Sequence, residues 1–205
     1  IVKKGVVYIA SGDQLLILNI NNPEFPTVLS QTALMGTAPV HMALEGNILY
    51  VPTTTGGGLN ILDVSDPYQP ETIAIVPFES HSAGFKISGD YAYLVYVAEY
   101  TSNLEVDYGF DSSSVLDVLD ISDPSTPSLV HSLVLPTDVR DVFLYGNYVV
   151  SVGVYTDEFL VIDISSPTAP VLEERPTESF SGSSFRWAYQ YDDYVYLLDS
   201  GSGVW

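Results

Sequence analysis

The chain contains no cysteine, so neither a disulfide framework nor a thiolate metal site can form within it. Positively charged side chains are also scarce: the 205 residues include six Lys and Arg residues but 26 Asp and Glu residues, which gives a net charge of −20. Binding to phosphate backbones or to anionic lipid heads normally requires clustered cations, so nucleic acid and membrane surfaces are disfavoured as partners. A strongly negative surface instead suits cations, saline or extracellular surroundings and high solubility.

Long apolar runs are also missing. No run approaches the roughly 18 to 20 residues of a membrane span, and the first ten residues, IVKKGVVYIA, lack the pattern of a cleavable signal. The chain shows almost no sustained helical periodicity, which disfavours helical repeats and βαβ units. We therefore predict no membrane insertion in these residues and a globular chain, for which 46% hydrophobic residues are ample.

What the sequence has in abundance is repetition. Four corner phrases, NNPEFP, SDPYQP, SDPSTP and SSPTAP, each contain two prolines three residues apart, and their first prolines are Pro23, Pro67, Pro124 and Pro167. A second mark, a Gly or Asp turn that leads into an aromatic or β-branched strand, recurs in phase at residues 5, 46, 89, 146 and 192. Two marks with one common period of about 43 residues indicate serial repeat units.

The predicted repeat units are residues 5–45, 46–88, 89–145 and 146–191, followed by a partial unit at 192–205; an insertion at 98–114 lengthens the third. Each unit reads as four short strands, and its prolines end a strand because proline lacks the amide hydrogen and has a fixed φ. Four strands in roughly 40 to 45 residues match one propeller blade. The predicted fold class is all-β: a β-propeller of four-stranded antiparallel blades, with about four complete blades and partial blades at both ends.

One polar slot precedes each proline corner, and it is occupied by Asn19, Asp63, Asp120 and Asp163. Short Asn and Asp side chains accept hydrogen bonds from the amides of a following turn. We therefore predict that these four side chains stabilise the corners, with a shared ligand-binding ring as the alternative.

The units resemble LVIVD repeats. The strands LLILNI, LNILDV, VLDVLDI and LVIDI, each followed by the proline corner and later by a G-N-Y-x-Y-like turn, carry this resemblance over nearly the whole chain. It implies a β-propeller, usually in secreted or surface-attached bacterial and archaeal proteins, and it brings no catalytic residues because the motif is architectural. Asn19 and Asn22 depart from the family pattern, since acids are usual there.

An open set of blades would leave sheet edges exposed, which proteins avoid. Residues 1–4 take the place of a strand end, and residues 204–205 take the place of a strand start. We therefore expect a fragment of a longer propeller, with a complete small propeller whose ends share a blade as the rival.

The insertion contains acidic side chains that could gather around calcium, which prefers carboxylate oxygens: Glu99, Glu105, Asp107 and Asp111. Their spacing does not match an EF-hand, and a solvated loop explains the same residues. His41 and His81 lie in corresponding connections of neighbouring units, but no third zinc ligand is in phase with them. His131 lies within a predicted strand. No cofactor other than calcium is indicated.

Motifs of common enzymes are missing, including a nucleophile elbow, a P-loop and an HExxH helix. Our leading hypothesis is a non-catalytic extracellular or cell-surface β-propeller that acts as a structural or interaction module. Its loops would present an acidic surface to a protein or a glycan. The alternatives are a propeller hydrolase or lyase with an active site at the channel mouth, and a self-assembling subunit of an extracellular filament or surface layer.

Overall fold

The computed structural model describes residues 1–39, 41–78, 81–97, 114–137, 139–153, 159–173, 185–191, 194–199 and 203–204. These residues form β-strands and turns, and none of them belongs to a helix that could cross a membrane. Contacts between residues divide the chain into two units: unit 1 comprises Ile1–Ser82 and Ile121–Pro127, and unit 2 comprises Ala83–Asp120 and Ser128–Trp205. The predicted all-β class is confirmed.

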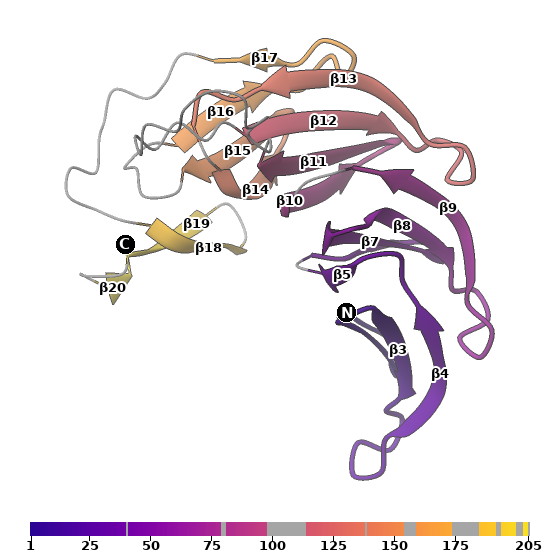
Figure 1. Ribbon diagram of the computed structural model, residues 1–205. Helices are drawn as coiled ribbons and strands as arrows, with labels where there is room; N and C mark the ends of the chain where they lie inside the picture. Colours follow the sequence, from indigo (N-terminus) through magenta and orange to yellow (C-terminus); the bar gives the residue numbers. More distant parts are fainter. Residues whose placement is uncertain are drawn as a thin grey trace, which may run out of the picture. The chain divides into compact units, whose positions relative to one another are not determined.

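Unit 1 contains two antiparallel sheets, most of whose strands are labelled in Figure 1. The first sheet has the order β1-β2-β3-β4, and the second has the order β5-β7-β8-β9, with β6 paired to β7. The strands are β1 Val2–Lys3, β2 Val6–Ser11, β3 Gln14–Asn19, β4 Thr27–Ala33, β5 Thr37–Pro39, β6 Ala43–Glu45, β7 Ile48–Thr55, β8 Gly58–Asp63 and β9 Glu71–Pro77.

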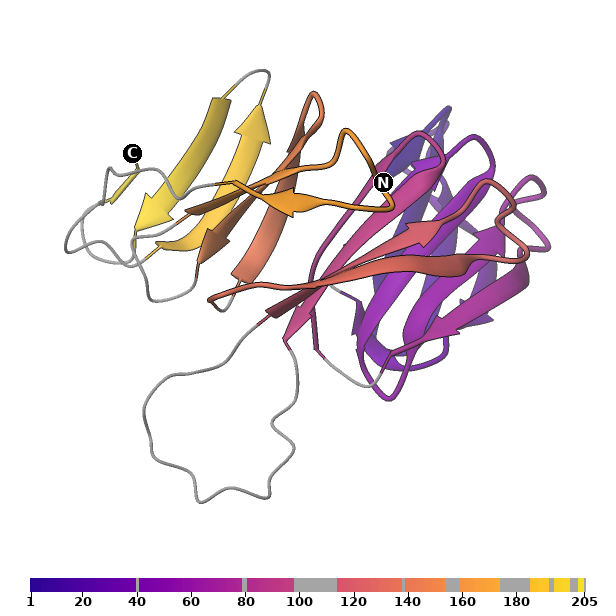
Figure 2. The ribbon, with the colours of Figure 1, turned by 90° about the horizontal axis from the view of Figure 1, so that it is seen from above.

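Unit 2 contains the third sheet, β10-β11-β12-β13, the fourth sheet, β14-β15-β16-β17, and the three-stranded fifth sheet, β18-β19-β20. Strands stay in chain order across each of these sheets, so the colour changes gradually across a sheet in Figure 2. The strands are β10 His81–Ser88, β11 Tyr91–Val97, β12 Ser114–Asp120, β13 Ser128–Val134, β14 Val139–Tyr145, β15 Tyr148–Gly153, β16 Phe159–Asp163, β17 Val171–Leu172, β18 Phe185–Tyr191, β19 Tyr194–Asp199 and β20 Gly203–Val204.

The sheets are offset from the sequence repeat by one strand. The glycine turn at Gly46, which opens a repeat, lies between β6 and β7 of the second sheet. The innermost strand of this sheet is therefore contributed by the end of the preceding repeat. Because such a strand belongs to one repeat in sequence and to the next in the sheet, it joins consecutive repeats by backbone hydrogen bonds.

Each sheet has two faces, which we name for sheets that pack within one unit: the leading face of the earlier sheet contacts the trailing face of the later one. In unit 1 the leading face of the first sheet packs on the trailing face of the second, with a core that contains Tyr8, Leu15, Ile17, Leu34, Leu49, Val51, Leu62 and Val64. In unit 2 the third and fourth sheets meet in the same way through Tyr93, Val95, Leu116, Val118, Leu135, Val139, Val142, Val149, Leu160, Ile162 and Ile164. Alternation along the strands supplies both faces with apolar residues.

Candidate functional site

The proline corners follow the third strand of the first four sheets and are hydrogen-bonded turns. The slot side chains accept the backbone N–H of the residue two positions later: Asn19 from Asn21 at 2.8 Å, Asp63 from Ser65 at 2.8 Å and Asp163 from Ser165 at 2.7 Å. The hydrogen bonds from Ser65 lower the pKa of Asp63. Asp120 ends β12 at the equivalent position. The slot residues thus close turns, as Asn and Asp do elsewhere.

A second turn encloses the first proline of the corner. The residue before the proline accepts the backbone N–H two positions later: Asn22 from Glu24 at 3.2 Å, Asp66 from Tyr68 at 2.9 Å and Asp123 from Ser125 at 2.9 Å. Carbonyl oxygens of the same residues accept the next amides, as from Phe25 to Asn22 at 3.1 Å. The corners around Pro23, Pro67 and Pro124 are therefore doubly hydrogen-bonded, and the turn around Pro167 is closed by the N–H of Ala169 on Ser166.

Two corners of unit 1 display aromatic side chains. Phe25 is 71% exposed and Tyr68 is 63% exposed, each between the two prolines of its corner. Figure 1 shows these turns protruding after β3 and after β8. Exposed acids flank the rings, Glu24 in the first corner and Asp66 in the second. We call the exposed side chains of residues 22–28 and 65–71 the corner surface.

The second corner is also tied to the neighbouring sheet of unit 1. The Ser30 hydroxyl on β4 donates to the Pro67 carbonyl oxygen at 2.7 Å. The rings of the corner surface consequently stand on backbone that is held by prolines, turn hydrogen bonds and this contact. A surface ordered before binding loses little conformational entropy when a partner docks.

A buried amide closes the seam between the two sheets of unit 1. The Asn60 side chain accepts the N–H of Met35 at 2.8 Å and donates to the carbonyl oxygens of Met35 at 3.0 Å and of Val51 at 3.2 Å. The buried Thr53 hydroxyl donates to Met35 O at 3.0 Å and accepts the N–H of Gly58 at 3.1 Å. These bonds fasten the link between β4 and β5 to the second sheet.

The backbone of Gly57 packs closely against the backbone of Met35 and Gly36, beside the Asn60 amide. A Cβ added to Gly57 would lie 2.1 Å from Thr53 Oγ1, 2.5 Å from Met35 O and 2.8 Å from Gly36 Cα. No side chain fits there, so glycine at residue 57 is required by the close packing of the backbone.

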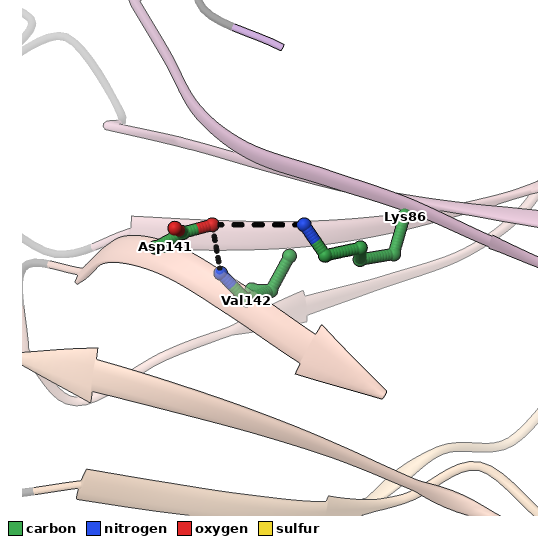
Figure 3. Close-up of polar contacts among 3 residues, drawn as sticks. All are labelled: Lys86, Asp141 and Val142. Carbon is green, nitrogen blue, oxygen red and sulfur yellow. Dashed lines mark hydrogen bonds and ion pairs between the residues drawn. The ribbon is translucent and has the colours of Figure 1, made fainter. Parts of the chain in front are cut away.

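The seam of unit 2 uses other polar groups. The buried Ser114 hydroxyl accepts the N–H of Val139 at 2.9 Å. On the innermost strands, Lys86 Nζ of β10 lies 4.0 Å from Asp141 Oδ1 of β14, which also accepts the N–H of Val142 at 2.8 Å, as Figure 3 shows. Lys86 Nζ also lies 5.7 Å from the centre of the Phe143 ring. The lysine and aspartate side chains remain 32% and 21% exposed.

Asp117 gathers a third polar cluster on the third sheet. Its carboxylate accepts the Tyr96 hydroxyl at 3.1 Å and the Ser132 hydroxyl at 2.6 Å. Burial, followed by the charge of Asp117 and the hydrogen bond to it, raises the pKa of Tyr96 to about 12. The protonated phenol is the form that donates to the carboxylate, so the cluster stabilises the neutral tyrosine.

Several predicted site residues fall where the structure gives no side-chain description. The calcium candidates Glu99, Glu105, Asp107 and Asp111 lie outside the described residues. His81 begins β10, but only its backbone is described; His41 lies between β5 and β6, and His131 lies on β13 opposite Val118. Across the described ranges, no three His, Asp or Glu side chains are arranged to hold a metal ion.

Sequence reasoning missed two polar residues inside strands, the buried Asn60 of the unit 1 seam and the partly buried Asp117 of the third sheet. Asn60 and Asp117 stand three positions before the slot residues Asp63 and Asp120, where the first sheet has Leu16. A polar residue inside an otherwise apolar strand was the available signal, because a buried amide or carboxylate needs hydrogen-bond partners. Which backbone groups would supply them was not readable from the strand itself.

Comparisons with known proteins place the chain by fold and family. Among 161 chains of solved structures that match, one is a candidate 6-phosphogluconolactonase from Bacteroides uniformis, with a TM-score of 0.64, 11% identity and coverage of 95% of this chain and 60% of that one. A chain of the nidogen/laminin complex matches with a TM-score of 0.53 and 12% identity, and the match covers 95% of this chain and 71% of that one. A chain of the S. cerevisiae complex of Dbp5 with Nup159, Gle1, IP6 and ADP matches with a TM-score of 0.54 and 12% identity. This match covers 98% of this chain and 56% of that one.

These likenesses define the class: the chain has the fold of a β-propeller protein, built from antiparallel sheets that mostly have four strands. The LVIVD repeat description matches residues 40–76, 110–134 and 136–177, slightly more than half of the chain. The chain therefore belongs to the LVIVD repeat family, and the predicted resemblance is confirmed. No curated protein matches it in sequence. The chain spans less than two thirds of the first and third structures named above.

Proposed function

We propose that this LVIVD-repeat propeller is a non-catalytic interaction module that binds a protein or a glycan through the corner surface of unit 1. The observation that carries this proposal is the pair of exposed rings, Phe25 and Tyr68, held on hydrogen-bonded, proline-bracketed turns. Exposed aromatic rings on rigid backbone provide contact area at a low entropy cost, and such residues dominate the energy of many interfaces.

The polar groups elsewhere support a scaffold role. Asn60 and Ser114 are buried and accept backbone amides, which secures the seams between sheets. The Asp117 carboxylate is occupied by two hydroxyl donors. Side chains used in this way hold the sheets in place, whereas recognition falls to exposed turns on a rigid framework.

We further propose an extracellular or cell-surface location. The net charge of −20 suits saline surroundings outside the cell. The chain contains no cysteine, so its fold does not depend on disulfides in any compartment. The partner of the corner surface would present cationic or hydroxyl groups, because Glu24, Asp66 and Glu71 accompany the rings. Fractionation of cells that express the full-length protein tests the location, and a cytoplasmic pool would refute it.

Binding is tested on an array of surface glycans and on a fraction of cell-surface proteins, with the 205-residue chain as the probe. The variant Phe25→Ser/Tyr68→Ser is expected to lose at least about tenfold in affinity, because both rings are removed. The control Ser125→Ala/Thr168→Ala changes exposed residues in the corners around Pro124 and Pro167 and is expected to bind as the wild type does. Equal retention of the double-ring variant, or no retention of wild type by any fraction, would overturn the proposal.

The enzymatic alternative rests on Lys86 and Asp141, a partly exposed ion pair on the innermost strands of unit 2. A propeller enzyme would place such groups at a channel mouth. A turnover screen with lactones, glycosides and esters tests this alternative: product formation that is abolished by Lys86→Met would replace the binding function with a catalytic one.

A further inference from the structure

The two residues between the paired prolines are exposed in all four corners. They are Glu24 and Phe25, Tyr68 and Gln69, Ser125 and Thr126, and Thr168 and Ala169. The second corner is bonded to the outer strand β4 of the preceding sheet, through the Ser30 hydroxyl and the Pro67 carbonyl oxygen, and yet Tyr68 is 63% exposed. Exposure at these positions is therefore a property of the corner itself, and it persists when a neighbouring sheet touches the corner.

The four corners share their prolines and their turns but differ in these exposed side chains. The corners around Pro23 and Pro67 each carry an aromatic ring, whereas the corners around Pro124 and Pro167 carry only small residues. Turn hydrogen bonds close all four corners through backbone groups and through the side chains that precede the first proline. The rings are therefore not needed to build a corner, and they are available for recognition.

Carboxylates accompany both rings. Asp66 accepts the N–H of Tyr68 at 2.9 Å, so its carboxylate lies against the backbone that carries the ring. Glu24 directly precedes Phe25 and is exposed, as is Glu71 at the start of β9. Each ring of the corner surface thus has an exposed acid within two residues of it.

No basic side chain of the corners neutralises these acids. Residues 5–85 contain no Lys or Arg, and this range includes both ring-bearing corners and the strands that flank them. A cation is attracted to the face of an aromatic ring, and a nearby carboxylate adds to the attraction. The guanidinium group of arginine satisfies both, because it stacks flat on a ring and forms paired hydrogen bonds with a carboxylate. A neutral glycan gains no ionic attraction from the same carboxylates.

We propose that the corner surface recognises an arginine-bearing segment of a partner protein, with guanidinium groups on the rings of Phe25 and Tyr68 beside the acids Glu24 and Asp66. This inference rests on the proposed function and names the chemistry of its partner. The net charge of −20 attracts a basic segment over long range and speeds its association. Salt screens exposed charges, so the affinity falls as the ionic strength rises.

Defined peptides test this inference on the 205-residue chain. The probe is a labelled, end-capped peptide of about eight residues, roughly 25 Å long when extended, in which arginine alternates with serine. Two matched peptides replace arginine with citrulline, which is uncharged and has nearly the same shape, or with lysine. Fluorescence anisotropy measures each Kd at low and high salt. The arginine peptide is expected to bind at least about tenfold more tightly than the citrulline peptide, and more tightly than the lysine peptide.

Two variants of the chain locate the site. Phe25→Ser/Tyr68→Ser keeps the net charge and is expected to weaken binding of the arginine peptide about fivefold or more, because both contacts between a cation and a ring are lost. Asp66→Asn removes one charge beside Tyr68 and is expected to weaken binding about threefold. Asparagine is compatible with this turn, since Asn22 accepts the N–H of Glu24 in the first corner. Circular dichroism checks the fold of every variant.

The matched control is Asp123→Asn. Asp123 is exposed and accepts the N–H of Ser125 at 2.9 Å, as Asp66 accepts that of Tyr68, but its corner carries no ring. Both substitutions change the net charge by the same amount. Asp123→Asn is expected to change the Kd of the arginine peptide by less than about twofold, because it affects only the screened long-range field. The difference between the two variants therefore reports on the ring-bearing corner.

Three outcomes would overturn the inference. The first is an arginine peptide that binds no more tightly than the citrulline or the lysine peptide, including no measurable binding of any. The second is an equal loss of affinity for Asp66→Asn and Asp123→Asn, which would mean that net charge alone attracts the peptide. The third is a folded Phe25→Ser/Tyr68→Ser variant that binds the arginine peptide as wild type does.

Failure of this inference and failure of the proposed function give different results. A chain that binds a neutral glycan through Phe25 and Tyr68, but does not distinguish arginine from citrulline, retains the proposed function and loses this inference. A chain whose binding to glycans, surface proteins and peptides is unchanged by loss of both rings loses the proposed function as well.

Discussion

Two seams can be compared: one between the first and second sheets in unit 1, and one between the third and fourth sheets in unit 2. Both have apolar cores, but different polar side chains form hydrogen bonds at each seam. In unit 1 the fully buried Thr53 and nearly fully buried Asn60 bond to the backbone of Met35. In unit 2 the Ser114 hydroxyl accepts the N–H of Val139, and the partly exposed pair Lys86 and Asp141 connects the innermost strands β10 and β14.

The difference shows that the repeat requires apolar residues at the seams but allows the polar residues there to vary. The apolar positions repeat because each sheet must bury its faces, and burial contributes most of the free energy of folding. The polar side chains of a seam only have to satisfy backbone groups near the link between two sheets, and an amide or a hydroxyl can do so. The polar residues of the seams are therefore free to differ from repeat to repeat.

The largest effect is expected from cavities in the two cores. Leu62→Ala in unit 1 and Leu160→Ala in unit 2 should each lower the free energy of unfolding by about 3 kcal/mol, because both side chains are fully buried. Urea denaturation measures both losses, and Leu129→Ala, at an exposed residue, serves as the control. A loss in only one unit would break the comparison between the seams.

Removal of the amide in unit 1 should have the next largest effect. Asn60→Ala is expected to lower the free energy of unfolding by about 2 kcal/mol, because it removes several hydrogen bonds and takes away the acceptor for the N–H of Met35. Asn21→Ala changes an exposed asparagine and is the control for denaturation measurements. Unchanged stability would show that Asn60 is not needed to close the seam.

A substitution in unit 2 should stabilise it. The Ser151 hydroxyl is buried and has no hydrogen-bond partner among the described residues, while the second sheet has Val51 at the same position. Ser151→Ala is expected to raise the free energy of unfolding by about 1 kcal/mol, since a buried unsatisfied hydroxyl is unfavourable. A destabilised variant in thermal denaturation would indicate that the hydroxyl is bonded in solution.

The Tyr96 cluster makes unit 2 sensitive to alkaline pH. The pKa of Tyr96 is raised from 10.0 to about 12 in the folded protein, so the folded state retains the proton to higher pH than the unfolded state. The stability that Tyr96 contributes is complete below pH 10 and is lost as the pH rises from about 10 to about 12. Tyr96→Phe cannot ionise, so it should be less stable than wild type at neutral pH, and the difference should shrink across this window. Denaturation curves at several pH values measure the difference; one that stays constant would contradict this role.

The smallest effect is expected for the ion pair. Lys86→Met should change the free energy of unfolding by less than about 1 kcal/mol, because partly exposed pairs are screened by water and the methionine retains contact with Phe143. Thermal denaturation at low and high salt measures this change. A loss as large as that of Asn60→Ala would show that the closure of unit 2 depends on charge.

Much of the fold could be predicted from the sequence because its marks are local. Proline at residues 23, 67, 124 and 167 ends a strand wherever the chain places it, and alternating apolar residues produce sheets with two buried faces. The acceptor role of Asp63 follows from the turn beside it. The partners of Asn60 were not predictable, because Met35 lies 25 residues away and reaches it only through sheet packing.

The sequence by itself determined the repeat, the strands and the corners, because backbone dihedral preferences and side-chain alternation act over a few neighbouring residues. The tertiary structure alone decided that each sheet takes its innermost strand from the preceding repeat, which aromatic rings stay exposed, and which backbone groups meet the buried polar side chains. Burial depends on the residues that arrive from distant parts of the chain, as the backbone of Met35 does at Asn60.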